Sequence, residues 1–208
     1  MSNADRFLIG FVCMMLCFIL PLVVLTRREG KSRTYLVLSI MIFYVVWYPA
    51  MTIIHEGSHY LGGILAGEQI TEVRLIPQFW KGDFVAKVNT QNMSRGQGAI
   101  SVPAPYVLDL LSLLIGVLLL RAIGRKRFFI SALLLTLFCL RPFFDIVSNY
   151  LGFVIWNQGD FKYLAGLYGS AAIYGAGIAF SGIALGIVWR LVMRGRRPGL
   201  QNAVQNEA

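Results

Sequence analysis

Five continuous apolar runs dominate this sequence, and each is long enough to cross the hydrocarbon core of a bilayer, which is about 30 Å thick. These runs cover residues 7–26, 35–66, 102–120, 128–156 and 169–193. Of the 208 residues, 57% are hydrophobic and only 14% are charged, a balance that water-soluble domains rarely show. The sequence therefore predicts an all-α polytopic membrane protein with about five transmembrane helices.

The formal net charge of +9 comes largely from basic clusters that directly follow the first, third and fifth apolar runs. Clusters of this kind mark the cytoplasmic ends of membrane helices. We therefore expect the N-terminus outside the membrane and the C-terminus in the cytoplasm. Because the charge lies beside the apolar runs, we expect the lipid bilayer as a partner and no nucleic acid. The sequence does not indicate an oligomeric state.

The segment of residues 69–100 departs from the helical pattern. Strand-like alternation at Val73 and Leu75 and again at 84–88 is interrupted by Pro77 and a Lys81-Gly82-Asp83 turn. Since exposed sheet edges are not tolerated in hydrocarbon, we expect a small β-hairpin or sheet at the membrane interface, between the second and third helices. The remaining connections are short, which predicts a single membrane-embedded domain over residues 1–197 and a disordered polar tail over 198–208.

The second apolar run contains His55, Glu56, Gly57, Ser58 and His59, which is the H-E-x-x-H pattern. Residues i and i+4 share one face of a helix, so the two imidazoles can bind one metal ion with Glu56 beside it. The chain has only these two histidines, and ionisable residues inside a bilayer usually serve a function. The motif predicts a zinc site with Glu56 as the general base of a hydrolase.

Two other interpretations of the motif stay open. His55, Glu56 and His59 could form a structural metal site or a polar cluster in a membrane protein without catalytic activity. The same residues could belong to a metal or proton transporter, which a continuous polar path through the second to fourth helices would favour.

The motif and its membrane context resemble the site-2 protease family of intramembrane zinc metalloproteases, over about residues 35–156. The resemblance implies that a small sheet and a further helix follow the motif, and that an aspartate in a later helix completes the zinc site. By this resemblance the chain is a zinc-dependent endopeptidase that cleaves a membrane protein or peptide in or near a transmembrane segment.

Two aspartates compete for the third zinc position, since catalytic zinc usually has three protein ligands and an open position. Asp145 follows Pro142 in the expected fourth helix, and we take it as the predicted ligand. Asp109 follows Pro103 and Pro105 in the third helix and is the alternative. Neither aspartate is followed by the glycine that the family motif carries.

Two polar residues share a helix face with Asp145 and are predicted to support it. Arg141 lies one turn before Asp145 and Asn149 one turn after it. Ligating carboxylates are commonly hydrogen-bonded by neighbouring residues of these types. Arg141 and Asn149 are therefore predicted to lie in the layer around the metal site.

Overall fold

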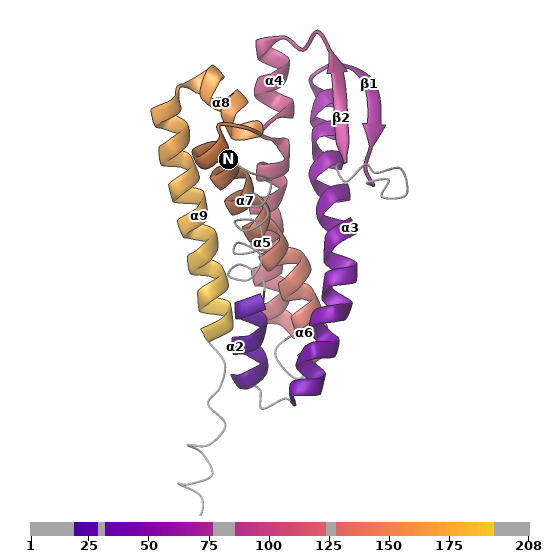
Figure 1. The fold of residues 1–208 in the computed structure, drawn as a ribbon, viewed down its shortest axis with the longest axis vertical. Coiled ribbons are helices and arrows are strands. Elements are labelled where there is room, and N and C mark those ends of the chain that lie inside the picture. Colours follow the sequence, from indigo (N-terminus) through magenta and orange to yellow (C-terminus); the bar gives the residue numbers. More distant parts are fainter. Residues whose placement is uncertain (1–18, 29–31, 77–85, 124–127, 194–208) are drawn as a thin grey trace, which may run out of the picture.

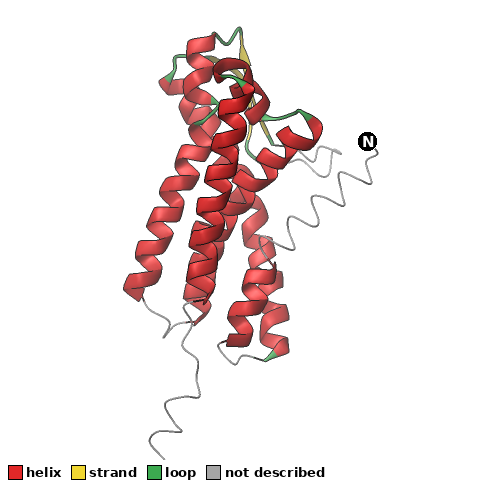
Figure 2. Cartoon of the chain, turned by 90° about the vertical axis from the view of Figure 1, so that its left-hand side faces the viewer, coloured by secondary structure: helices red, strands yellow, loops and turns green. Residues whose placement is uncertain are grey.

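The structure is a computed structural model that describes residues 19–28, 32–76, 86–123 and 128–193. It consists mostly of helices, with one small sheet near one end of the bundle (Figures 1 and 2). The helices are α2 (Leu20–Arg28), α3 (Arg33–Leu65), α4 (Arg95–Ser101), α5 (Ala104–Ile123), α6 (Phe128–Leu135), α7 (Arg141–Trp156), α8 (Asp160–Tyr168) and α9 (Ser170–Met193). A π-helical turn, Thr136–Leu140, joins α6 to α7.

Three of the described stretches are long and apolar enough to cross a membrane: Arg95–Ile123, Ile130–Trp156 and Ser170–Met193. They coincide with the third, fourth and fifth predicted spans. The second predicted span coincides with α3, whose 33 residues form a helix about 50 Å long. Most of the first predicted span and the tail of residues 198–208 lie outside the described residues.

A two-stranded antiparallel sheet follows α3, as the alternation pattern predicted. Strands β1 (Gln69–Arg74) and β2 (Lys87–Gln91) pair with Val73 opposite Val88, and an irregularity in register lies between Ile70 and Glu72. The predicted Lys81-Gly82-Asp83 turn lies outside the described residues. The sheet lies beside the end of α3 (Figure 1), so β2 reaches the helix that carries the H-E-x-x-H motif.

Prolines break the next membrane segment into α4 and α5. Pro103 and Pro105 lack backbone N–H groups, so they cannot hydrogen-bond to carbonyls of the preceding turn. The carbonyl of Ser101 would normally accept from residue 105, and Pro105 leaves it without that donor. A carbonyl is thereby freed where α4 and α5 pass α3.

The chain reverses sharply between α7 and α8. Asn157 ends α7 in the left-handed conformation with φ of 52°, and Gly159 follows with φ of +80°. Positive φ favours asparagine and glycine because other side chains are strained there. The buried ring of Phe161 then anchors α8, with its centroid 4.8 Å from that of Tyr106. These features place Asp160, the first residue of α8, at the level of the motif on α3.

Candidate metal centre

The H-E-x-x-H residues lie in the last third of α3. His55 precedes the final residue of the helix by ten positions, and both imidazoles project from the same side of it. The two ring centroids are 4.9 Å apart. The helical spacing therefore brings the rings together as the motif predicted.

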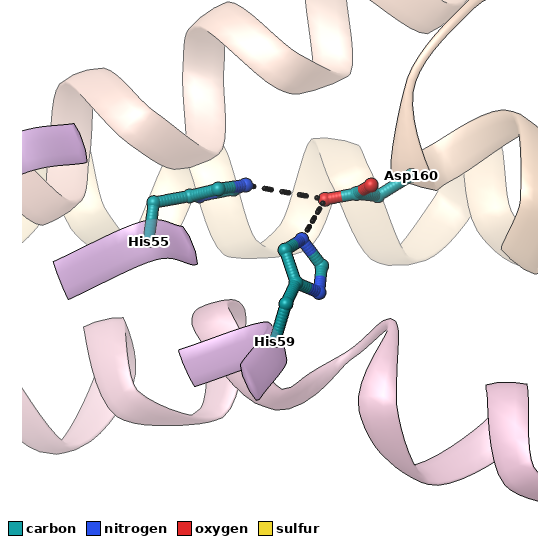
Figure 3. Close-up of side chains that lie close together, drawn as sticks. All are labelled: His55, His59 and Asp160. Atoms are coloured by element: carbon teal, nitrogen blue, oxygen red, sulfur yellow. Dashed lines mark hydrogen bonds and ion pairs between the residues drawn. The ribbon is translucent and has the colours of Figure 1, made fainter. Parts of the chain in front are cut away.

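Asp160 completes a group of three metal-binding side chains with His55 and His59 (Figure 3). Its Oδ2 atom lies 3.4 Å from Nε2 of His55 and 3.1 Å from Nε2 of His59. A tetrahedral zinc site with ligand distances of about 2.0–2.1 Å has edges of about 3.3 Å between ligand atoms. The two measured separations are close to that edge length, and all three ligand atoms lie within 4.8 Å of one another, which is near enough to hold one metal ion.

The other nitrogen of His55 is held by Asp145. Nδ1 of His55 lies 2.8 Å from Oδ2 of Asp145, and the Asn149 amide donates to Oδ1 of the same carboxylate at 2.7 Å. When Nδ1 carries the proton, His55 donates to Asp145 and keeps a lone pair on Nε2. A carboxylate behind a histidine in this way fixes the tautomer and the ring orientation of metal-binding histidines.

The other nitrogen of His59 is held by the backbone. Nδ1 of His59 lies 3.0 Å from the carbonyl oxygen of Ser101, which is the carbonyl that Pro105 leaves free. Proton donation from Nδ1 to this oxygen again leaves the lone pair on Nε2. With both Nδ1 atoms protonated, the two Nε2 lone pairs would face the same carboxylate oxygen, and a cation bound between them would satisfy all three acceptors.

Tyr106 supports the third member of the group. Its hydroxyl donates to Oδ2 of Asp160 at 2.9 Å from the first turn of α5. Burial raises the pKa of the Asp160 carboxyl, but hydrogen bonds from the rings of His55 and His59 outweigh burial and hold that pKa well below its usual range. Asp160 is therefore an ionised carboxylate that can bind a cation.

A buried ion pair lies behind Asp145. Nη2 of Arg141 is 2.7 Å from Oδ1 of Asp109, and Nη1 is 4.0 Å from Oδ2 of Asp145. All three side chains are at most 1% exposed. The backbone N–H of Arg141 bonds to the carbonyl of Thr136 across the π-helical turn, so this turn sets the position of the guanidinium between two carboxylates.

A cleft of about 320 Å³ opens beside these residues. Its lining includes His55, Glu56 and His59 from α3, with Val88 from β2 and Asp160 from α8. The Glu56 carboxylate is close enough to the backbone N–H of Val88 to accept a hydrogen bond. The general base predicted from the motif therefore faces the same cleft as the metal-binding atoms.

The structure brings the predicted residues together in a different arrangement from the one that the sequence suggested. Asp145 contacts His55 on the nitrogen that faces away from Asp160, and Asp109 pairs with Arg141 behind it. The Asn149 amide donates to Asp145, and the Arg141 guanidinium lies 4.0 Å from the same carboxylate.

Asp160, Ser101 and Tyr106 were not among the site residues predicted from the sequence. The sequence held one signal for Asp160. It is an acidic residue that follows Gly159, just after the fourth span and before a short segment with aromatic residues.

The chain matches no protein-family model, and no curated protein or solved structure shows significant similarity to it.

Proposed function

We propose that this chain is a zinc-dependent membrane hydrolase, and specifically an endopeptidase similar to the site-2 protease family. The observation that carries the proposal is the convergence of Nε2 of His55, Nε2 of His59 and Oδ2 of Asp160. Each imidazole is also held from behind, by Asp145 and by the Ser101 carbonyl, so that Nε2 is the free atom. The separation of 3.1 Å between Nε2 of His59 and Oδ2 of Asp160 is also a hydrogen-bond length, so zinc content is the measurement that distinguishes a metal site from a polar cluster.

The proposal changes the third ligand from Asp145 to Asp160. Asp145 has the role of orienting His55, and the Arg141–Asp109 pair lies behind it. A bound zinc ion supplies Lewis acidity, which polarises a carbonyl and makes water a better nucleophile at neutral pH. Glu56 is the proton acceptor for the attacking water and the proton donor to the leaving amine. The Tyr106 hydroxyl holds the Asp160 carboxylate in place.

A polypeptide substrate fits the position of the sheet. In the two-stranded sheet, β2 pairs with β1 on one side only, and Val88 of β2 lies at the cleft beside Glu56. An extended peptide can add to such an edge through backbone hydrogen bonds. This binding mode would present backbone carbonyls to the metal centre, whereas a helix shields its own carbonyls within its hydrogen bonds.

The transporter interpretation has one observation in its favour. Ionisable side chains continue from the metal centre into the core through Asp145 and Arg141 to Asp109. At the inner end of this path, Arg141 and Asp109 are held in a buried ion pair at 2.7 Å. Zinc or proton flux into vesicles that contain the purified protein would support transport. Peptide cleavage without such flux would support the hydrolase.

The test of the proposed function compares wild type, Glu56→Gln and His59→Ala in zinc content and in cleavage of a membrane-peptide library. We expect wild type to bind zinc and to cleave. E56Q keeps the metal ligands and should retain zinc while its cleavage rate falls by at least about 100-fold, the range associated with loss of a general base. H59A should lose both. Cleavage by E56Q at the wild-type rate, or cleavage that a zinc chelator does not inhibit, would contradict the proposal.

A further inference from the structure

Glu68 lies just beyond the end of α3 in a well-defined helix cap. The N–H of Glu68 bonds to the carbonyl of Gly63 at 2.8 Å, and the N–H of Gly67 bonds to that of Ile64 at 3.1 Å. Gly67 has φ of +70°. This pair of hydrogen bonds around a left-handed glycine is the Schellman motif, which satisfies the last carbonyls of the helix.

The side chain at this cap departs from the usual pattern. The two residues in the positions of Glu68 and Gly63 commonly make an apolar contact in Schellman motifs. Here a carboxylate lies over a glycine, and Oε2 of Glu68 is 3.2 Å from the place where a Cβ of Gly63 would be. A negative charge at a helix C-terminus also opposes the helix dipole. The local structure therefore gives no stabilising reason for this carboxylate, and such departures concentrate at functional sites.

The Glu68 carboxylate has an acceptor atom to spare. Its Oε1 atom is buried and has no hydrogen-bond partner among the described residues. Lys87 lines the same cleft, but its ammonium is 2.8 Å from Oε2 of Glu72, and Oε1 of Glu72 is 2.9 Å from Nη2 of Arg74. Hydrogen bonds from Lys87 and Arg74 lower the pKa of Glu72, as expected for a carboxylate held by these cations. Lys87 and Arg74, among the residues that the structure describes, are thus bound by Glu72.

The position of Gly63 relates this carboxylate to the metal centre. His55, His59 and Gly63 follow each other at intervals of four residues, so they form one stripe along α3. Gly63 lies about 6 Å beyond His59 along the helix axis. An extended peptide advances about 3.3 Å per residue, so 6 Å corresponds to roughly two residues.

We propose that Glu68 forms a subsite for a cationic side chain, lysine or arginine, about two residues from the peptide bond that is hydrolysed. Glu68 lines the same cleft as His55, Glu56 and His59, and its free oxygen supplies the acceptor for an ammonium or guanidinium group. This inference rests on the proposed function, because the metal centre defines the position of the reacting bond.

The test uses peptide hydroxamates, which bind zinc through the hydroxamate group and are not cleaved. Three otherwise identical hydroxamates carry arginine, its neutral analogue citrulline, or glutamate at the second residue from the chelating group. Their dissociation constants are measured with the full-length, zinc-loaded protein in detergent micelles. The proteins are wild type, Glu68→Gln, Glu68→Lys and the matched control Gln69→Ala, whose side chain is exposed and does not line the cleft. Equal zinc content in all four shows that each variant is folded at the metal centre.

We expect wild type and Q69A to bind the arginine compound about tenfold more tightly than the citrulline compound, as one charge-assisted hydrogen bond provides. E68Q should lose this ratio, and E68K should prefer the glutamate compound. Equal binding of arginine and citrulline by wild type, or an unchanged ratio in E68Q, would overturn the subsite and leave the proposed function standing. If none of the compounds binds in a zinc-dependent way, the proposed function fails, and the subsite fails with it.

Discussion

Nδ1 of His55 lies 2.8 Å from Oδ2 of Asp145, on the side of the imidazole ring that faces away from Asp160. One ring thus contacts two carboxylates through different nitrogens, and the two contacts have different consequences. The Asp145 contact orients the ring, whereas the Asp160 contact lies where a metal would bind both histidines.

This relationship predicts the effect of Asp145→Asn. An asparagine keeps the size of the side chain but removes the charge that fixes the His55 tautomer. Zinc affinity should fall about 10- to 100-fold, the usual effect of removing such a partner, while one zinc still binds at saturation. Competition with a chelator of known zinc affinity measures this change. Complete loss of zinc from D145N would instead favour Asp145 as a ligand, as the sequence predicted.

The Arg141–Asp109 pair predicts a change in stability. Removing one member of a fully buried ion pair leaves an uncompensated charge, so Arg141→Gln should lower the free energy of unfolding by about 3–5 kcal/mol. The double variant Asp109→Leu with Arg141→Met should be closer to wild type, because it does not leave the Asp109 charge buried without its partner. Unfolding in mixed micelles measures both. Equal decreases in the free energy of unfolding for R141Q and for the double variant would show that the unpaired charge does not cause the destabilisation.

The close packing of helices at Gly62 should make zinc binding sensitive to a larger side chain there. A Cβ at Gly62 would lie 2.8 Å from Cα of Ser101 and 2.9 Å from Cβ of Ala104, both closer than van der Waals contact. Gly62→Ala should push α4 away from α3, lengthen the bond between His59 and the Ser101 carbonyl, and destabilise the protein by about 1–3 kcal/mol. Zinc affinity should also fall, because His59 would be held less well by the Ser101 carbonyl.

The matched control for that variant is Gly57→Ala on the same helix. Gly57 lies inside the H-E-x-x-H motif, yet a Cβ there would meet no atom within 4 Å. G57A should keep wild-type zinc affinity and gain up to about 1 kcal/mol from helix propensity. If G57A and G62A weaken zinc binding equally, the packing explanation is wrong.

The pH dependence of zinc binding should follow the histidines. The pKa of Asp160 is held well below its usual range, so this carboxylate stays ionised while the pH falls. Imidazoles have an ordinary pKa of about 6.5, and protons compete with metal for their nitrogens. Zinc affinity should therefore fall as the pH is lowered and the imidazoles take up protons, as an indicator-based titration can measure. Release that begins only below about pH 4 would assign the step to a carboxylate.

Much of the architecture could be predicted from periodicity and composition. Apolar length predicted the three helical stretches that can cross a membrane, and alternation around Val73 and Val88 predicted the small sheet. The four-residue spacing of His55 and His59 predicted that their rings would converge. These features depend on local sequence, which is why local patterns were sufficient.

The rest of the site depends on tertiary packing that local patterns do not encode. Asp109 and Asp145, the two aspartates predicted as candidates for the third ligand, lie within the membrane helices. The motif, however, is near the end of α3, and the reversal at Asn157 and Gly159 brings Asp160 back to that level. The Ser101 carbonyl could not be predicted as a partner of His59, because backbone groups carry no sequence signature.

The most direct test of the account is the number of zinc ions bound per chain, measured by elemental mass spectrometry, for wild type beside Asp160→Asn. Both proteins are equilibrated with the same chelator of known zinc affinity. We expect one zinc per wild-type chain and little or none in D160N, since Oδ2 of Asp160 lies within 3.4 Å of both Nε2 atoms. A wild-type chain that binds no zinc, or a D160N variant that binds as much as wild type, would contradict it.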